Sequence, residues 1–376
     1  MQAIASEFDQ CIKCGLCLAA CPVGKTLFLE KYTPRGKIQL AKQYALNTLE
    51  ISDHYRDIFA ECLLCGACAA ACPSGVGLKD VFLEMRAEIV RHKGPHPTVE
   101  PVLQSLDQNR NISGEDNTER GEWRDDMEPP PEDGYERDKA DIVYFVGCVA
   151  SFFPMVQGIP QNFVKILEKA GADFTVMAGK EWCCGYPLIA SGHPEKAEAL
   201  MAHNLEQIAR TGASKVIFTC PSCYHTWKTH EPARLELFHS TQFINQLVQN
   251  GNLTLRAVNR TVTFHDPCDL GRNGGVFDAP REVLSAIPGL SLVELPNNRS
   301  QSICCGGGGN LEMTDPDLSG TIAGKKLDEI QRTGAKTVVT ACQQCVRTIK
   351  GTARKQKRDL NVVDITDLTI EAISDA

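Results

Sequence analysis

Two pairs of directly adjacent cysteines place the strongest constraint on this chain. They are Cys183–Cys184 in EWCCGYP and Cys304–Cys305 in SICCGGGG. Neighbouring Cα atoms lie about 3.8 Å apart across a trans peptide, whereas a relaxed disulfide needs roughly 4.4–6.8 Å between them. An ordinary disulfide within either pair is therefore disfavoured, and the recurrence of the pair points to an internal repeat.

The two pairs belong to a set of 18 cysteines in 376 residues. The N-terminal MQAIASEFDQC has neither the positive nor the apolar region of a secretory signal. The longest apolar stretch, 142–156, is too short to span a bilayer. We therefore expect a cytoplasmic protein, in which so many cysteines are metal or redox ligands rather than a disulfide scaffold. The net charge of −8 gives no reason to expect a nucleic-acid partner.

The first eight cysteines form two copies of C-x2-C-x2-C-x3-C-P, the pattern that ligates cubane [4Fe–4S] clusters in two-cluster ferredoxins. Three closely spaced thiolates can hold one cluster, and we expect the fourth cysteine to open a helix that leads to the other. One expected ligand set is Cys11, Cys14, Cys17 and Cys72. The other is Cys62, Cys65, Cys68 and Cys21. Zinc sites, which use C-x2-C pairs, fit this pattern less well.

The remaining ten cysteines form two quintets with nearly equal internal gaps. The first is Cys148, Cys183, Cys184, Cys220 and Cys223. The second is Cys268, Cys304, Cys305, Cys342 and Cys345. Corresponding cysteines lie about 121 residues apart, and RTGASKVIFTC aligns with RTGAKTVVTAC, so the quintets belong to a duplicated unit.

Each repeat alternates short β-branched runs with amphipathic stretches. The expected strands are 141–148, 173–178, 215–219, 261–268, 290–295 and 337–342. The expected helices are 158–172, 193–213, 279–289 and 318–335. This alternation predicts βαβ units in parallel sheets, which bind ligands outside the carboxyl ends of their strands. All cysteine groups follow strands, so we expect each quintet to converge.

The predicted fold is an α-helical two-cluster ferredoxin-type head followed by two duplicated α/β domains with parallel, Rossmann-like sheets. The expected boundaries are 1–95 for the head, 96–140 for an acidic strap or linker, 141–257 for the first α/β domain and 258–376 for the second. The segment 96–140 is charged and lacks periodicity, as disordered linkers do. Trp123 nevertheless favours an ordered strap.

Glycines follow both adjacent pairs. We expect Gly185, Gly306, Gly307 and Gly308 to bind a cofactor, because a backbone without Cβ atoms can approach a cluster and donate N–H groups to it. The alternative is that Gly306–Gly309 forms only a flexible loop.

The quintets resemble the CCG (cysteine-rich) domain of heterodisulfide reductases, and YFVGCVASFFP, HDPCDLGR and CCGGGGNLEM add to the resemblance. The whole chain resembles the D-type subunit of heterodisulfide reductases and a wider set of iron–sulfur oxidoreductases that includes subunits of glycolate and lactate oxidases. The resemblance implies two noncubane [4Fe–4S] clusters that face each other and split a disulfide, with Cys184 and Cys305 as catalytic residues. Gln343–Gln344 and Asp269 depart from the family pattern and put substrate contacts near the second cluster in doubt.

The resemblance implies that electrons pass from a partner through two cubane clusters to the CCG domains, where a heterodisulfide-type disulfide is reduced. The partner would be a membrane cytochrome b, a flavoprotein dehydrogenase or another heterodisulfide reductase-like subunit. It could seat the chain peripherally at the inner face of a membrane. The alternative is an electron-transfer subunit of a flavin-dependent or quinone-linked complex, without its own substrate. A third interpretation is structural, with zinc in the cysteine domains.

Three further side chains carry weaker expectations. His265, three residues before Cys268, either donates a proton to a leaving thiolate or caps a strand end. Arg272 either offsets the negative charge of a cluster or pairs with a carboxylate. Lys326, with its neighbour Lys325, is expected on the solvated face of a helix.

Overall fold

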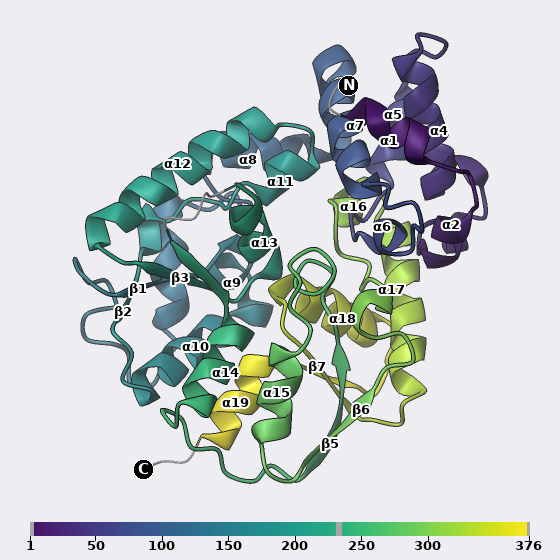
Figure 1. Cartoon of the computed structure of the whole chain (residues 1–376). Coiled ribbons are helices and arrows are strands. Elements are labelled where there is room, and N and C mark those ends of the chain that lie inside the picture. Colours follow the sequence, from purple (N-terminus) through teal and green to yellow (C-terminus); the bar gives the residue numbers. More distant parts are fainter. Residues whose placement is uncertain (1–3, 231–234, 374–376) are drawn as a thin grey trace.

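The computed structural model describes residues 4–230 and 235–373 of the chain. Figure 1 shows a helical head at the upper right, a first α/β domain at the left and a second at the lower right. The helices of the head are α1 (Ala5–Gln10), α2 (Leu16–Ala20), α3 (Gly24–Leu27), η2 (Glu30–Tyr32), α4 (Pro34–Ala45), α5 (Asp53–Ala60), α6 (Ala67–Ala70) and α7 (Leu78–Lys93).

The longer helices of the head begin at residues that satisfy free backbone N–H groups. The Thr33 hydroxyl accepts a hydrogen bond from the Gly36 amide at the start of α4, and Ser52 accepts one from Tyr55 at the start of α5. Helices α4, α5 and α7 then enclose an apolar core that includes Ile38, Phe59, Phe82 and Met85.

One sequence expectation about the head was wrong. Cys21 does not open a helix, because it lies at the C-cap of α2, and Cys72 follows α6 in the corresponding way. Each short helix starts at a glycine with positive φ, +84° at Gly15 and +71° at Gly66. Glycine adopts a left-handed backbone conformation at no steric cost because it has no Cβ. The cysteine loop can therefore turn sharply into the helix.

The first α/β domain contains a four-stranded parallel sheet with the order β2-β1-β3-β4. Its strands are β1 (Ile142–Phe145), β2 (Phe174–Val176), β3 (Lys215–Phe218) and β4 (Glu236–His239). Its helices are α9 (Cys148–Phe152), η5 (Pro154–Val156), α10 (Gly158–Lys169), η6 (Ala178–Lys180), α11 (Tyr186–Ala190), α12 (Pro194–Thr211), α13 (Pro221–His230) and α14 (Ser240–Gln249).

The second domain repeats this topology in the order β6-β5-β7-β8. Its strands are β5 (Arg260–His265), β6 (Leu290–Glu294), β7 (Thr337–Thr340) and β8 (Asn361–Asp364). Its helices are α15 (Ala279–Ala286), η7 (Arg299–Gln301), α16 (Leu311–Thr314), α17 (Pro316–Gln331), α18 (Gln343–Lys355) and α19 (Ile365–Ala372). The two parallel sheets confirm the expected duplication, and each has a fourth strand, β4 or β8, that the sequence did not predict.

The two α/β domains pack against each other in a reciprocal way. Helix α10, which follows the first strand of one domain, contacts α19, which follows the last strand of the other. Helices α15 and α14 make the corresponding contact with the domains exchanged (Figure 1). One hydrophobic core runs through both sheets. The domains are therefore related in the same way as the two halves of an isologous dimer.

The segment between the head and the first sheet contains α8 (Glu100–Asn109) and the 3-10 helices η3 (Pro97–Val99) and η4 (Asn117–Arg124). Leu103 and Leu106 of α8 and Trp123 of η4 are buried in the core of the α/β domains. The segment thus packs on the body of the protein. Across the described residues, no helix combines the length and hydropathy of a membrane-spanning segment.

Candidate metal centres and cavity

The four cysteines of each expected cubane set lie around one small hollow in the head. Cys11, Cys14, Cys17 and Cys72 line the outer hollow. Cys21, Cys62, Cys65 and Cys68 line the inner hollow. Each hollow therefore takes three cysteines from one loop and the fourth from the other.

The two hollows differ in their surroundings. Cys14 of the outer hollow is exposed to solvent, whereas burial raises the pKa of Cys21 in the inner hollow to about 11. The inner hollow is also lined by Lys37, whose side chain is 2% exposed. The Lys37 ammonium donates a 2.6 Å hydrogen bond to the carbonyl of Glu61, and burial lowers its pKa. The Cys62 and Cys21 thiolates act on this pKa in the opposite direction, so a positive charge on Lys37 is favoured when the inner cysteines are thiolates.

The inner cysteines of the head contact the second α/β domain. A hydrogen bond from Cys304 lowers the pKa of Cys65 to about 6, so the two thiols are neighbours. Arg272 donates a 2.9 Å hydrogen bond to the carbonyl of Cys65. Its other hydrogen bonds go to the carbonyls of Ser300 and Ser302. All of these acceptors are carbonyls, so none of these bonds pairs the guanidinium with a carboxylate. Its positive charge lies between the head and the second quintet.

The glycines after Cys305 lie where two backbones approach each other. A Cβ on Gly308 would lie 2.8 Å from the carbonyl oxygen of Leu63 in the head, and one on Gly306 would lie 2.6 Å from that of Ser319. Gly306 also has a φ of +101°. Gly308 is needed so that the second α/β domain can meet the cysteine loop of the head, and Gly306 is needed where the loop passes α17 of its own domain. The sequence alone did not reveal either reason.

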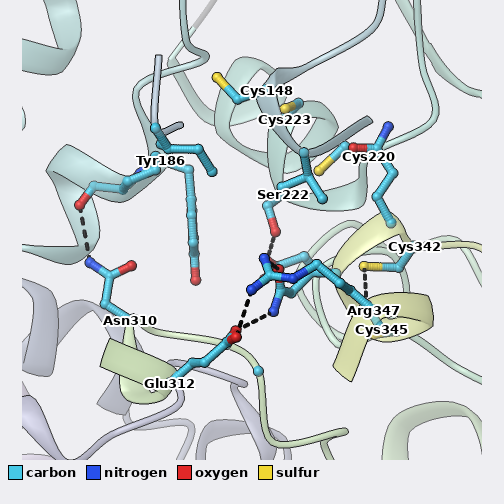
Figure 2. A pocket seen from close by; sticks show the side chains of 18 of the residues that line it. Cys148, Tyr186, Cys220, Ser222, Cys223, Asn310, Glu312, Cys342, Cys345 and Arg347 are labelled. Atoms are coloured by element: carbon cyan, nitrogen blue, oxygen red, sulfur yellow. Dashed lines mark hydrogen bonds and ion pairs between the residues drawn. The ribbon is translucent and has the colours of Figure 1, made fainter. Parts of the chain in front are cut away.

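Cysteines from both α/β domains line a single cavity of about 340 Å³ (Figure 2). They are nine of the ten quintet cysteines, namely Cys148, Cys183, Cys184, Cys220, Cys223, Cys268, Cys305, Cys342 and Cys345. The tenth, Cys304, is buried beside Cys65. The two expected catalytic cysteines lie in the cavity wall, and the glycines Gly307 and Gly308 do as well.

The thiols of Cys184 and Cys305 are the more acidic of each adjacent pair. Hydrogen bonds from Cys183 and then Cys223 lower the pKa of Cys184 to about 6. A hydrogen bond from Cys304 lowers the pKa of Cys305 well below its usual value. Both thiols are therefore poised to act as thiolates.

Polar side chains line the cavity beside the cysteines. Arg347 forms a 2.6 Å ion pair with Glu312, and its guanidinium lies over the ring of Phe153 (Figure 2). Asp269 accepts a 2.6 Å hydrogen bond from Ser222. Apolar side chains that include Val102, Ile112, Val149 and Met313 complete the wall.

A buried ion pair supports the first quintet. Glu181 accepts hydrogen bonds of 2.9 Å from the amides of Val146 and Gly147, just before Cys148. Its partner is Arg120 of the segment 96–140, at 2.9 Å, and both side chains are at most 1% exposed. Arg120 also donates a 3.4 Å hydrogen bond to the Cys148 thiol. The strap thus delivers a positive charge to the first quintet, although its sequence gave no sign of this.

The second quintet has different support. The thiols of Cys305 and Cys345 lie 3.4 Å apart, and His265 lies beside both. Lys326 forms a 2.5 Å ion pair with Glu329, and its side chain is fully buried. The expectation that Lys326 lies on a solvated face was therefore wrong. It is four residues from both Ile322 and Ile330 on α17, so the helical period could have placed it on the buried face.

Gln343, one of the two residues that depart from the family pattern, is completely buried and connects the two α/β domains. Its amide nitrogen donates to the carbonyl of Val146 and the hydroxyl of Thr219, and its amide oxygen accepts from the Ala150 amide. Gln344 donates a 2.7 Å hydrogen bond to Glu312. Both glutamines line the cavity, and Gln343 in addition holds the two domains together.

The donor set of these sites fits iron–sulfur centres. All 18 cysteines are free of disulfides, and they gather in groups of four or five. Lys37, Arg120 and Arg272 place positive charge beside them, which favours thiolate ligands. Backbone N–H groups are close as well, since Gly24 donates to the Cys21 sulfur at 3.3 Å.

Comparisons with known proteins give a consistent result. The chain matches the cysteine-rich domain family (CCG) at residues 142–228 and 262–350, and a 4Fe–4S dicluster domain family at residues 7–76. It is 32% identical to the D-type subunit of the dihydromethanophenazine:CoB–CoM heterodisulfide reductase of Methanosarcina barkeri, over 98% of this chain and 94% of that protein.

A more distant relative differs in its named role. The EtfAB:quinone oxidoreductase of Syntrophomonas wolfei is 26% identical over 98% of this chain and 58% of its own length. Among solved structures, a hypothetical protein from Helicobacter pylori superposes with a TM-score of 0.59 at 12% identity, over 91% of this chain and 67% of that one. That likeness shows a shared fold.

Proposed function

Because the chain belongs to the family of the D-type subunits of heterodisulfide reductases, an iron–sulfur oxidoreductase family, we propose that it reduces a disulfide with electrons taken from a partner protein. The disulfide binds in the cavity between the two CCG domains. The domain limits of the proposal are residues 1–95 for the head, 96–140 for the strap, and 141–257 and 258–376 for the CCG domains.

The observation that carries this proposal is the shared cavity. Nine quintet cysteines from two separate domains line one space of about 340 Å³, which falls in the range of small-molecule sites. The two quintet clusters would themselves take up part of this space, and its lining beyond the cysteines, which includes Arg347, Glu312 and Gln344, suits a small disulfide beside them. The reciprocal packing of the domains brings the two quintets to this space from opposite sides.

The proposed ligand assignment follows the four cysteine groups. Each head hollow holds a cubane [4Fe–4S] cluster, and each quintet holds a noncubane one. These clusters would supply one-electron carriers in the head, and iron that can bind sulfur at the cavity. The thiolates of Cys184 and Cys305 lie closest to the proposed chemistry, since both line the cavity and both have lowered pKa values.

The rest of the cavity wall orients the substrate. The apolar side chains of the wall exclude water and pack against an alkyl arm of the disulfide, while Arg347, Glu312 and Gln344 offer hydrogen bonds to a polar arm. Arg347 is the one cation in the described lining, and Glu312 already neutralises it. We therefore expect a disulfide with few negative charges to bind better than a highly anionic one.

The partner that exchanges electrons docks at the outer hollow of the head. Cys14 is exposed there, and its neighbours Ile12 and Leu16 are 67% and 54% exposed. Apolar side chains of this size are common in the centres of protein interfaces. The inner hollow then connects this entry point to the second CCG domain through the contact between Cys65 and Cys304.

The second candidate function is an electron relay without a substrate of its own. The observation that favours it is the relative named as an EtfAB:quinone oxidoreductase, which matches over nearly the whole chain. In this case the cavity holds the quintet clusters without a substrate, and electrons leave to another protein of the complex.

The deciding experiment is viologen-linked turnover of anaerobically purified protein with a panel of disulfides, after iron has been counted. Four tetra-iron clusters correspond to about 16 irons per chain. Oxidation of reduced viologen only when a disulfide is present supports the reductase. If full-iron protein accepts electrons but no disulfide removes them, the relay is correct. A colourless protein without acid-labile sulfide would leave only the structural zinc interpretation.

A matched pair of variants tests the cavity itself. Met313 lines the cavity, whereas Met155 is exposed elsewhere. Met313→Trp should abolish or strongly reduce disulfide turnover while iron content and reduction by dithionite stay unchanged. Met155→Trp should change none of these. Equal turnover in both variants would show that the disulfide does not enter this cavity.

A further inference from the structure

His265 is a buried histidine without a conventional partner. It is the last residue of β5, and none of its side chain is exposed. Neither ring nitrogen meets the geometry of a hydrogen bond among the described residues, although the ring interacts with the neighbouring Cys305 thiol. A buried polar group that is left unpaired costs about 1–3 kcal/mol, so the imidazole is held here for the thiols beside it or for a group that they share.

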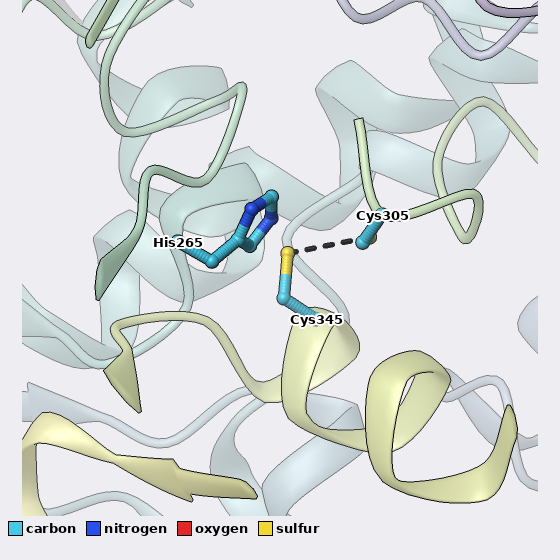
Figure 3. A group of neighbouring side chains, drawn as sticks. All are labelled: His265, Cys305 and Cys345. Atoms are coloured by element: carbon cyan, nitrogen blue, oxygen red, sulfur yellow. Dashed lines mark hydrogen bonds between the residues drawn. The ribbon is translucent and has the colours of Figure 1, made fainter. Parts of the chain in front are cut away.

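Two cysteine thiols of the second quintet lie beside the ring (Figure 3). One ligand atom from each of His265, Cys305 and Cys345 lies within 4.8 Å of the others, and the two sulfurs are 3.4 Å apart. Ligands at about 2.0–2.3 Å from a tetrahedral metal are separated by similar distances. The three side chains are therefore spaced as the ligands of one metal atom are.

The corresponding position in the first CCG domain shows that the fold does not require a histidine. That position is Phe145, which also ends the first strand of its sheet and also lies three residues before a quintet cysteine. Its ring packs on Phe218 and Trp227 at 5.4 Å. An apolar ring fills this place in the first domain. The imidazole of the second domain is therefore there for its polar ring nitrogens and not for packing.

His265 does not directly contact a substrate in the cavity. Cys305 and Cys345 line the cavity, whereas His265 does not. The ring therefore approaches the two cysteines from the interior of the domain. This position suits a ligand of the second quintet, and it keeps the ring out of direct contact with a substrate in the cavity.

We propose that His265 is a nitrogen ligand of the metal centre in the second CCG domain, at the iron that Cys305 and Cys345 also bind. This inference rests on the proposed function, which places a metal centre in the second CCG domain. Imidazole is neutral where thiolate is negative, and replacing thiolates by histidine raises the potential of an iron–sulfur centre. The two CCG centres are then chemically different, with nitrogen at the second alone.

Pulsed electron paramagnetic resonance of anaerobic, iron-replete protein tests this ligand. Protein labelled with ¹⁵N only in histidine should show the strong coupling of a directly bound nitrogen in the signal that Cys345→Ser removes. His265→Phe, which installs the residue of the first domain, should lose this coupling. His239→Phe is the matched control, because His239 is equally buried at the end of β4, and it should keep the coupling.

The isotope experiment on the unmodified chain decides the question even if a variant fails to fold. No histidine coupling, or only the weak coupling of a hydrogen bond, overturns the inference, and so does an unchanged coupling in His265→Phe. A chain that reduces disulfides without this coupling refutes the ligand and leaves the reductase intact. A chain with the coupling but without disulfide turnover refutes the reductase and leaves the ligand.

Discussion

Arg86 donates a 2.9 Å hydrogen bond to the carbonyl of Gly309, which lies 223 residues further along the chain. The same guanidinium, 6% exposed, donates to four other carbonyls. These belong to Phe59, Ala60, Cys62 and Ala190. One side chain therefore connects the head with both CCG domains and satisfies backbone groups beside the inner hollow.

Removal of this guanidinium should destabilise the protein strongly. Arg86→Leu leaves five carbonyls without their donor in a dry interface, and we expect a loss of about 3–5 kcal/mol in the free energy of unfolding. Anaerobic urea denaturation measures this loss. Arg91→Leu on the same helix is the control, because Arg91 forms an exposed ion pair with Glu88 and should cost less than about 1 kcal/mol. Equal losses in the two variants would contradict the role given to Arg86.

The sequence predicted the parts of this protein that follow from local spacing. The cysteine patterns indicated which four cysteines gather at each hollow of the head, and the strand–helix alternation indicated two parallel sheets. Such inferences succeed because ferredoxin loops are compact and because parallel strands end at one edge.

The sequence did not reveal features that depend on distant segments. Nothing near Arg86 or Arg120 distinguishes them from surface arginines, since partners such as the Gly309 carbonyl of Arg86 and the Glu181 carboxylate of Arg120 lie far along the chain. Strands β4 and β8 were missed because each has only four residues and carries a polar residue at both ends. Short edge strands of this kind have little hydrophobic pattern to detect.

The buried Gln343 should matter more for stability than its neighbour Gln344. Gln343→Leu removes the donor to Val146 and the acceptor of the Ala150 amide in a buried interface, which should cost about 1–3 kcal/mol. Gln344→Leu changes the cavity wall and should alter the apparent affinity for a disulfide with little loss of stability. Urea denaturation and disulfide titration of both variants separate the two effects. The reverse order of stability would be inconsistent with the observed hydrogen bonds.

The positive charge of Lys37 should raise the potential of the inner head centre. A cation beside a negatively charged cluster favours its reduced state, and Lys37 is buried against the inner cysteines. Lys37→Met should therefore shift the midpoint potential of that centre to a lower value, as measured by redox titration with electron paramagnetic resonance. Lys42→Met on the same helix, where Lys42 pairs with Asp9 near the surface, should leave it unchanged.

The buried His239 should make the stability of the first CCG domain sensitive to acid. Burial lowers the pKa of His239 to about 3, whereas an unfolded histidine titrates near 6.5. Between these values the unfolded chain binds the extra proton, so stability rises with pH up to about 6.5 and is lost as the pH falls below it.

The effect of His239 can be isolated by comparing variants at two pH values. From pH 8 to pH 6, this one group should cost about 0.8 kcal/mol of unfolding free energy. His239→Asn retains a residue that can cap α14 but does not titrate, so it should show a smaller loss over this interval than the native chain. Urea denaturation at both pH values measures the difference. An identical pH dependence in both proteins would mean that His239 is not held neutral by burial.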